Sequence, residues 1–422
     1  MKLNRKFVEA AAVILLLHAA CTFAQVKPVS LSDYLHAALT SNPLIRSAEQ
    51  AGVSARFSSD AIQKGYFPQI GVGSHLIFAP GYDEAVTNGG EFGAQIVGSY
   101  TIYDGGAKTY EIQKGEIGVE QGSVNENKTK ADIIYTVSTA FVAAVKEKRE
   151  VSISEQDHDV LGNYLQLVKQ LQASGQGSET DVLKATVELN NATIDIEARK
   201  VAFKNSLLTL SQAAGLPSSD VSDVDTGSVS IPYDAGFNEE KNIDIASLKL
   251  ALKQAELDAQ VVGAKLRPSL SLGADAGALT SLPNIHPGLS NVFGASVGIS
   301  VSLPLFTFGS VEDNYSAAEA NANSVSLQND YSRILMERDF EGTSNDVANA
   351  NSEIAALKKN LSVAEQNFLL SKARYAGGGG LSLEVLDAIQ MINQIRLAIE
   401  EADARMKTDI LKLNRLNYNG AD

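Results

Sequence analysis

Residues 293–303, FGASVGISVSL, alternate strictly between apolar side chains at odd positions and Gly or Ser at even positions. This period of two places the apolar side chains on one face of a β-strand. Residues 270–278 alternate in the same way, and residues 69–79 and 92–103 do so more loosely. One face of the stretch 69–79 carries Ile70, Val72, Leu76 and Phe78. The sequence therefore predicts four strands of about ten residues, the length of a tilted membrane-spanning strand.

Aromatic residues lie at or near the ends of these stretches: Tyr66, Phe67, Phe78, Tyr82, Tyr100, Tyr103, Phe306 and Phe308. Membrane barrels place aromatic side chains at the lipid–water interfaces, so this distribution favours strands in a membrane. Alternation by itself favours a soluble β-sandwich with one wet face. Four strands beside about 300 residues of predicted helix are too few for such a sandwich to be the main fold.

Two long stretches without proline, residues 107–172 and 311–375, follow the two pairs of predicted strands. A later stretch repeats an apolar residue every seven positions, at Val385, Ile392, Ile399, Met406 and Leu413. Sustained seven-residue spacing predicts antiparallel helices that pack as coiled coils. An ordinary helical bundle would show the same spacing and remains an alternative.

The chain is self-similar when it is shifted by about 200 residues. At a shift of 203, residues 101–106 align with 304–309, and DVLKA at 181–185 aligns with EVLDA at 384–388. Each half is therefore predicted as helix, strand, strand, long helix, glycine-rich turn and helix. The predicted organisation is a signal peptide, a first repeat, a linker region and a second repeat, at residues 1–24, 25–214, 215–241 and 242–422.

Composition excludes several classes of protein. Lys and Arg number 35 against 50 Asp and Glu, and a net charge of −15 argues against a nucleic-acid partner. A single cysteine excludes a disulfide framework and a cysteine-based zinc site. After the first 24 residues no stretch reaches the roughly 18 apolar residues of a membrane helix, so any span must be β.

The N-terminus has the pattern of a secretory signal peptide. Lys2, Arg5 and Lys6 precede the apolar residues 10–20, and small residues up to Ala24 offer a cleavage site. Export as a lipoprotein acylated at Cys21 is the alternative, although His18 occupies a position where such signals prefer a small or aliphatic residue. Whether Cys21 is lipidated or removed stays open.

Four strands cannot close a barrel, and lipid does not tolerate an open sheet edge. Strands of this chain in a membrane must therefore be pooled among several chains, eight from two or twelve from three. Twelve strands leave room for an aqueous lumen, whereas eight are filled by side chains. Small Gly and Ser on one face suit an open conduit, so we predict a trimer. The fold class is mainly α with a small β part.

These features together resemble the TolC-like outer-membrane efflux family, over roughly residues 30–418. The resemblance rests on LSDYLHAALTSNP at 31–43, GYFPQ at 65–69, YDGG at 103–106, and the doubled motifs DVL at 181–183 and EVLD at 384–387. It implies a homotrimer with a twelve-stranded barrel in outer-membrane lipid and a coiled-coil tunnel across the periplasm. It also implies a passive exit duct of a tripartite efflux or type I secretion system, which receives cargo from a periplasmic adaptor and an inner-membrane transporter.

The resemblance places the periplasmic entrance at two helical turns, residues 173–180 and 376–382. The family's acidic entrance positions correspond to Asp181, Glu384 and Asp387, and a family tyrosine corresponds to Tyr375. An arginine common in the family is replaced by Gly380, which puts the usual closing ion pairs in doubt. We hypothesise that Glu384 and Asp387 form rings of carboxylates that favour cations. The alternative is that these carboxylates only solvate a helix surface.

The adaptor is expected to dock at these same turns. The candidate docking residues are Gly175, Gly177, Val182, Leu183, Gly378, Gly380, Val385 and Leu386. The glycine run 377–380 lacks the Lys-Ser/Thr that follows a phosphate-binding loop, so we interpret it as a hairpin between helices.

No catalytic residue, cofactor or metal site is predicted. Ser296 lies in a pattern typical of a nucleophile elbow, but in mid-strand, where that motif does not occur. The histidines are scattered without metal-ligand spacing. We therefore expect no enzyme. An exported coiled-coil scaffold or adhesin and an exported hydrolase remain alternatives, and the sequence names neither the cargo nor the class of transporter served.

Overall fold

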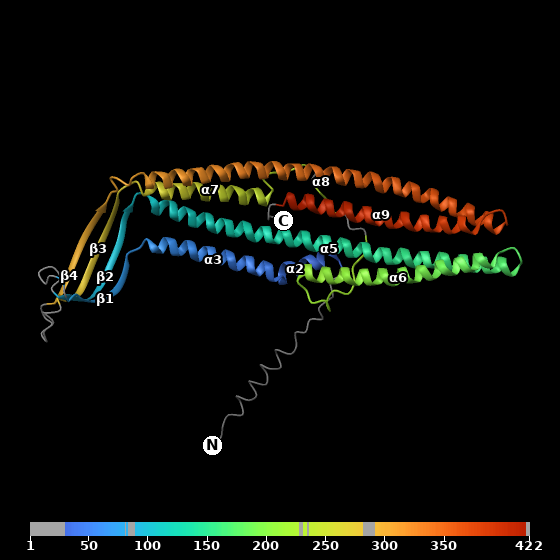
Figure 1. Cartoon of the computed structure of the whole chain (residues 1–422), viewed down its shortest axis with the longest axis horizontal. Helices are drawn as coiled ribbons and strands as arrows, with labels where there is room; N and C mark the ends of the chain where they lie inside the picture. Colours follow the sequence, from blue (N-terminus) through green and yellow to red (C-terminus); the bar gives the residue numbers. More distant parts are fainter. Residues whose placement is uncertain are drawn as a thin grey trace, which may run out of the picture. The chain divides into compact units, whose positions relative to one another are not determined.

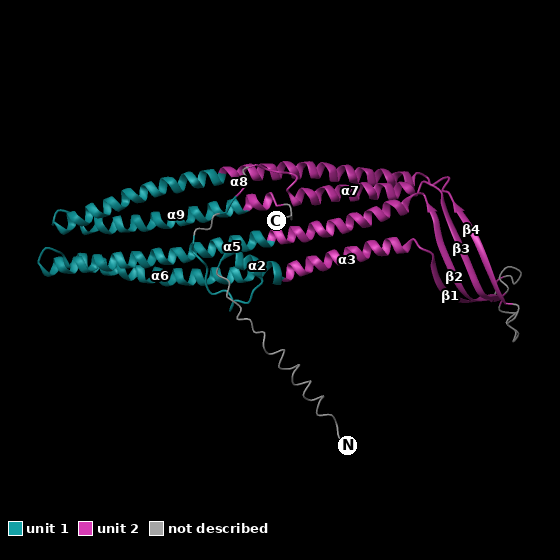
Figure 2. Ribbon diagram, turned by 180° about the vertical axis from the view of Figure 1, so that it is seen from behind, with its two compact units in different colours: residues 1–42, 133–232, 346–411 teal, residues 43–132, 233–345, 412–422 magenta. Residues whose placement is uncertain are grey.

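The structure is a computed structural model that describes residues 30–80, 82, 89–227, 231–233, 236–281 and 292–418. The predicted signal peptide and Cys21 lie outside these residues. The chain divides into two compact units, which Figure 2 colours separately. Unit 1 comprises Met1–Asn42, Ile133–Pro232 and Asp346–Leu411, and unit 2 comprises Pro43–Asp132, Tyr233–Asn345 and Lys412–Asp422. Each unit therefore contains residues from both halves of the sequence.

The order of elements follows the same plan in the two halves of the chain (Figure 1). The first half contains α2 (Leu31–Ser41), α3 (Pro43–Gly65), β1 (Gln69–Phe78), β2 (Gly90–Asp104), α5 (Ala107–Ala173) and α6 (Glu179–Ala214). The second half contains α7 (Ile243–Ala264), β3 (Ser269–Ser281), β4 (Phe293–Ser302), α8 (Ser310–Ala376) and α9 (Ser382–Leu416). The four strands and the two long helices lie where the sequence predicts them, and both long helices have 67 residues.

The four strands of unit 2 form one antiparallel sheet in the order β1-β2-β3-β4. The register pairs Val72 with Ile96, Ile96 with Ala276, and Ala276 with Ala295, which makes a continuous apolar row across the sheet. Because side chains alternate along a strand, Ile70, Leu76 and Phe78 share that face with Val72. The predicted apolar face of β1 is therefore confirmed.

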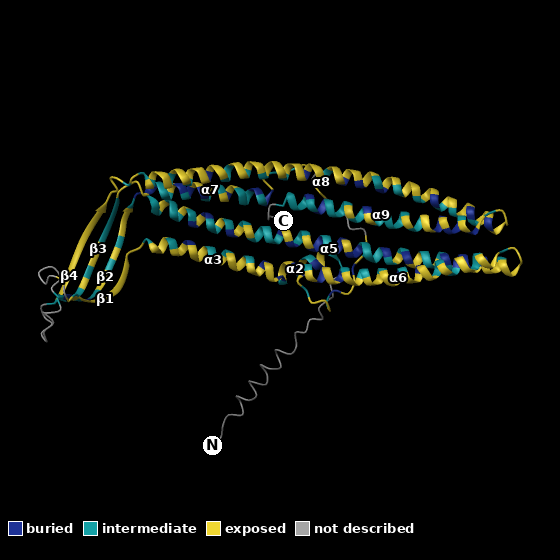
Figure 3. Cartoon of the chain, in the orientation of Figure 1, coloured by how far each residue is buried: buried dark blue, intermediate teal, exposed yellow. Residues whose placement is uncertain are grey.

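The opposite face of the sheet carries small and polar residues. One row there runs from Gly71 through Val97 and Asp275 to Ser296. All ten residues of β1 and of β4 are exposed, as Figure 3 shows, and Val72 is 83% exposed. An exposed apolar face of this extent is the kind of surface that contacts lipid or another chain.

Helix α3 approaches α5 closely within unit 2, and glycines permit that approach. A Cβ atom on Gly122 would lie 3.3 Å from the Cα atom of Gly52, and one on Gly115 would lie 2.9 Å from Oγ of Ser59. A larger residue at either position would hold the two helices apart. Among the described residues, no helix is both long enough and apolar enough to cross a membrane.

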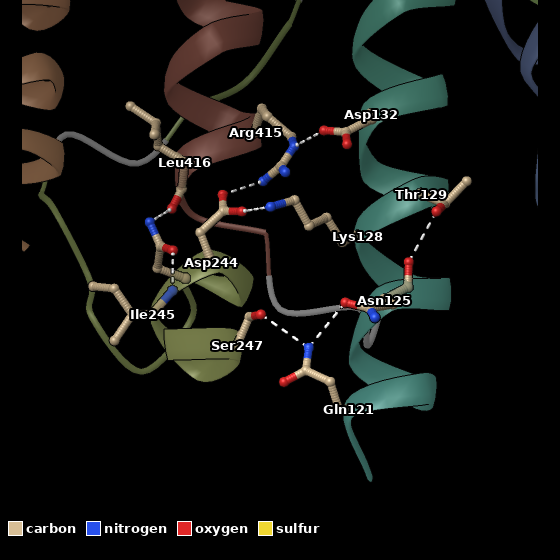
Figure 4. A network of polar contacts seen from close by, with 11 residues as sticks. Gln121, Asn125, Lys128, Thr129, Asp132, Asp244, Ile245, Ser247, Arg415 and Leu416 are labelled. Atoms are coloured by element: carbon tan, nitrogen blue, oxygen red, sulfur yellow. Dashed lines mark hydrogen bonds and ion pairs between the residues drawn. The ribbon is translucent and has the colours of Figure 1, made fainter. Parts of the chain in front are cut away.

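A polar network joins α5, the start of α7 and the end of α9 in unit 2 (Figure 4). Asp244 accepts from Nζ of Lys128 at 2.7 Å and from Nη1 of Arg415 at 3.1 Å. The Nε atom of Arg415 also lies 2.7 Å from Oδ1 of Asp132. Burial would raise the pKa of Asp244, but its two cationic partners outweigh burial and lower that pKa. The carboxylate therefore stays charged and holds three helices in register.

The segment 31–43, which carries part of the family resemblance, is fastened within unit 1. Tyr34 is fully buried, and its hydroxyl donates to the carbonyl oxygen of Asp223 at 2.8 Å. Nδ2 of Asn42 donates to the carbonyl oxygen of Ala213 at 3.3 Å. These two polar side chains fix α2 against the end of α6 and the segment that follows it.

Candidate functional site

Two helical hairpins of unit 1 end in turns of matching geometry, one between α5 and α6 and one between α8 and α9. Gly175 and Gly378, which are 203 residues apart, have φ angles of 77° and 78°. This left-handed conformation strains any residue with a side chain, which explains the glycines. The amide of Gln176 donates to Leu171, and the amide of Gly379 donates to Arg374, both at 2.9 Å. The predicted repeat therefore extends to the backbone of the turns.

The region below the turns is packed around an apolar cluster. Its buried members are Leu161, Tyr164, Leu165, Val168, Ala185, Ala192, Tyr375, Val385, Leu386 and Ile389. Val385 is fully buried and Leu386 is 5% exposed, whereas Leu183 is 60% exposed and Val182 is partly buried. Of the apolar residues predicted to dock an adaptor, Leu183 therefore offers the most accessible surface.

Tyr375 and Asp181 come together from the two hairpins. The Tyr375 hydroxyl donates to Oδ2 of Asp181 at 3.2 Å, and the tyrosine ring is buried. Burial, with Tyr164 and Asp181 adding to it, raises the pKa of Tyr375 to about 12. The hydroxyl therefore keeps its proton throughout the physiological range and acts as a permanent donor to the carboxylate.

Tyr164 makes a second link between the hairpins that the sequence did not indicate. Its hydroxyl donates to Oγ of Ser382 at 2.8 Å, at the first residue of α9. Its ring lies 6.0 Å from the ring of Tyr375, tilted by 50°. Burial raises the pKa of Tyr164 as well. No motif marks this contact, because its partners are 218 residues apart.

Glu384 has an arginine nearby, although position 380 is a glycine. Nη1 of Arg374 lies 3.6 Å from Oε2 of Glu384, an ion pair just beyond hydrogen-bond reach. Arg374 and Glu384 are equally distant in sequence from Gly379, so counting outward from the turn would have found the pair. Asp387 is exposed one turn further along α9. The two predicted carboxylates of α9 thus differ in how far their charge is compensated.

The polar face of the sheet forms a separate group of contacts in unit 2. Oδ2 of Asp275 accepts from Nε2 of Gln95 at 3.0 Å, and Ser296 donates to the other carboxylate oxygen. His75 bonds to Glu91 at 2.7 Å, on the edge pair β1–β2. The residues that the structure describes contain no group of three or more metal-ligating side chains. Ser296 therefore has a carboxylate partner but no histidine, on a face that suits the lining of an aqueous channel.

Comparison with known proteins follows the whole described chain. A profile of the family described as "Outer membrane efflux protein" matches residues 34–216 and 239–417. The chain is 21% identical over 402 residues to the outer membrane efflux protein BepC of Brucella suis biovar 1 (strain 1330), covering 93% of this chain and 86% of that protein. It is 20% identical to the outer membrane protein TolC of Salmonella enteritidis, covering 91% and 80%.

Solved structures share the fold. The structure of the outer-membrane channel OprN superimposes with a TM-score of 0.82 at 19% sequence identity. The match covers 92% of this chain and 90% of that one. The mainly helical architecture with a four-stranded sheet is therefore a known channel fold, and the two regions that the profile matches correspond to the two halves of the chain.

Proposed function

The chain belongs to the outer membrane efflux protein family, and on that premise we propose that three copies form a duct through the outer membrane and periplasm. Export from the cell is the family's role, and it agrees with a fold shared with solved channels. The duct is passive: a periplasmic adaptor and an inner-membrane transporter deliver the cargo and supply the energy. This role is favoured over that of an exported coiled-coil scaffold or adhesin.

The observation that best supports a trimer is the sheet with two unpaired edges. β1 pairs with β2 and β4 with β3, so each edge strand has one side without a partner inside the chain. An unpaired backbone edge in lipid costs several kcal/mol for each unsatisfied group, so the edges must pair with other copies. Three copies supply twelve strands, enough to surround an aqueous lumen. The apolar face then contacts lipid and the face with Gln95, Asp275 and Ser296 lines the conduit.

The two turns of unit 1 are proposed as the periplasmic entrance. The contacts Tyr375–Asp181 and Tyr164–Ser382 both join the α5–α6 hairpin to the α8–α9 hairpin. Breaking them lets the hairpins separate, so we assign them to the closed state of the entrance. Asp387 and Glu384 supply negative charge there, with Arg374 offsetting part of it.

Adaptor docking is proposed at the outer surface of the turns. Gly175, Gly177, Gly378 and Gly380 allow the tight backbone, and Leu183 presents exposed apolar surface beside it. Val385 and Leu386 contribute from beneath, because their side chains belong to the buried cluster. We also propose that the protein catalyses no reaction, and a Ser296→Ala variant with unaltered properties would support this.

Disulfide cross-linking tests the pooled barrel. Cysteine is placed singly at each of residues 70–73 of β1, and each is combined with Val297→Cys on β4. At least one pair is expected to form a disulfide between chains in isolated outer membranes, giving trimers on non-reducing gels, because neighbouring strands bring Cβ atoms within bonding range. Scanning four residues covers the unknown register between copies.

The matched control is a pair within one chain. Val72 lies directly opposite Ile96, so the pair Val72→Cys and Ile96→Cys is expected to cross-link without changing the apparent mass of the chain. If this control forms a disulfide while no β1–β4 pair joins two chains, the pooled barrel is wrong.

A further inference from the structure

A cavity of about 320 Å³ lies within unit 1, between α5, α8 and α9, away from the turns. Most of its wall is apolar, formed by Ile153, Val160, Phe368, Leu369, Ile389 and Ile392. Ile389 is 2% exposed and forms the floor, whereas Leu369 is 64% exposed and lies at the mouth. A concave apolar site of this volume has the dimensions that bind small molecules.

The polar groups of the cavity wall differ in how well they are paired. Nη2 of Arg396 donates to Oε1 of Glu365 at 3.1 Å, and its Nη1 reaches Gln156 at 3.5 Å. Glu365 and Arg396 therefore largely neutralise each other. Asp157 accepts a long hydrogen bond of 3.4 Å from Nδ2 of Asn393, and among the described residues it forms no ion pair within 4.0 Å.

Neighbouring carboxylates on α6 already have their own donors. Asp195 accepts from Oγ of Ser154 at 2.6 Å, and Glu188 accepts from Nε2 of Gln390 at 3.3 Å. These groups line a second cavity of about 180 Å³, which shares Asp157 with the larger one. Asp157 thus stands at the junction of two cavities with most of its accepting capacity unused.

The charge around Asp157 is negative from several sides. Glu188 and Asp195 face it from α6, Glu365 lies across the larger cavity on α8, and Arg396 and the adjacent His158 oppose them. A carboxylate beside an apolar cavity in such surroundings attracts a cation and repels an anion.

We propose that this cavity binds an organic monocation, whose charged nitrogen contacts Asp157 and whose apolar body fills the space lined by Ile153, Val160 and Ile389. The site lies in the wall formed by one chain, and the inference does not depend on the conduction pathway. A ligand held there contacts α5, α8 and α9 together, so its binding stabilises their packing.

The site should respond to pH. Burial, followed by the charge of Asp195, raises the pKa of Asp157 to about 6; Glu188 adds to this, whereas Arg396 and His158 oppose it. Above that pH the carboxylate is charged and pairs with the cation; below it the group is neutral and the attraction is lost. Cation binding is therefore expected to weaken as the pH falls through about 6.

Fluorescence titration of the purified full-length protein with ethidium tests the proposal. Ethidium is expected to bind saturably at about pH 7.5, and roughly tenfold more weakly in Asp157→Asn, the loss of one close charge pair. The anion anilinonaphthalene sulfonate is expected not to compete with it. Asp159→Asn is the matched control, because Asp159 lies two residues along the same helix with a side chain that is 83% exposed.

A second variant keeps the charge and removes the space. Val160→Phe fills the cavity and is expected to abolish ethidium binding while Asp157 remains; circular dichroism confirms that both variants are folded. Equal ethidium affinity in Asp157→Asn and Asp159→Asn, or undiminished binding in Val160→Phe, would overturn the proposal.

Discussion

Gly177 and Gly380 occupy the same position in two turns that are 203 residues apart in the sequence. A Cβ atom on Gly177 would lie 2.8 Å from the backbone nitrogen of Gln172, and one on Gly380 would lie 2.9 Å from that of Tyr375. Both distances are shorter than side chains tolerate against backbone atoms. The end of each long helix is therefore so close to the following turn that a methyl group does not fit.

Alanine at either position should destabilise its turn. Gly177→Ala and Gly380→Ala are each expected to cost about 1–3 kcal/mol, because the backbone must move to admit the methyl group. The midpoint of thermal unfolding, followed by circular dichroism, measures the loss. Gly379→Ala is the control, since its Cβ would be 3.9 Å from the nearest contact, the carbonyl oxygen of Arg374. An unchanged midpoint for Gly380→Ala would contradict the crowding.

Tyr375→Phe should favour the open entrance. The change removes the hydroxyl that donates to Asp181 and keeps the buried ring. One hydrogen bond contributes about 1 kcal/mol, so the ratio of open to closed states is expected to rise roughly fivefold for each chain. Single-channel recording in planar bilayers measures it. Tyr331→Phe, at a side chain that is 62% exposed on the same helix, should behave as the wild type. If both variants conduct alike, Tyr375 does not hold the entrance closed.

Charge changes at the turns should alter ion selectivity in opposite directions. Arg374→Gln uncovers Glu384 and is expected to raise selectivity for cations, whereas Asp387→Asn is expected to lower it. Replacing both Glu384 and Asp387 by Ala should lower it most. Reversal potentials across a salt gradient measure all three. Unaltered reversal potentials in the double variant would rule out the carboxylate rings.

Arg415→Gln should weaken the junction of α5, α7 and α9. Arg415 is 13% exposed and pairs with Asp132 and Asp244, so its loss leaves a half-buried carboxylate with fewer partners. We expect a loss of about 1–2 kcal/mol in the free energy of unfolding, measured by denaturant titration in detergent. Lys64→Gln breaks an exposed pair with Asp60 and should change that energy by less than about 0.5 kcal/mol. Equal effects would mean that the network adds no stability.

Asp157→Asn should stabilise the protein at neutral pH. The folded protein raises the pKa of Asp157 from 3.8 to about 6, so it binds the proton more tightly than the unfolded chain. The contribution of this group to stability is full below the unfolded pKa and is lost as the pH rises through about 6. The variant is therefore expected to gain about 1 kcal/mol at about pH 7.5, shrinking toward about pH 4. Thermal midpoints across this range test the sign, and a gain that is independent of pH would contradict it.

Much of the fold was predictable because its signals are local. Alternation between residues 293 and 303 reports on neighbours two positions apart, and the seven-residue spacing from Val385 to Leu413 reports on neighbours one or two turns apart. Both patterns describe a single element, and the structure has strands and helices at those places. The doubled motifs similarly predicted that both hairpins end in glycine turns, and Gly175 and Gly378 have matching backbone angles.

The candidate site was less accessible to sequence analysis. The resemblance pointed to Tyr375 and Asp181, which the structure brings within 3.2 Å. It did not supply the bond from Tyr164 to Ser382, and attention to Gly380 hid the charge that Arg374 places near Glu384. The Asp157 cavity had no signal at all, because its walls come from three helices that are separated by long stretches of chain.

The sequence by itself determined the period of each element, the apolar face of each strand and the places where the chain must turn. These follow from backbone geometry, in which a side chain's direction depends on its position within a few residues. The tertiary structure decided which polar groups meet: that Asp244 has two cations, and that Asp157 has none within reach of an ion pair. Charge compensation depends on distances of a few ångströms between distant segments, and only the packing of the helices sets those distances.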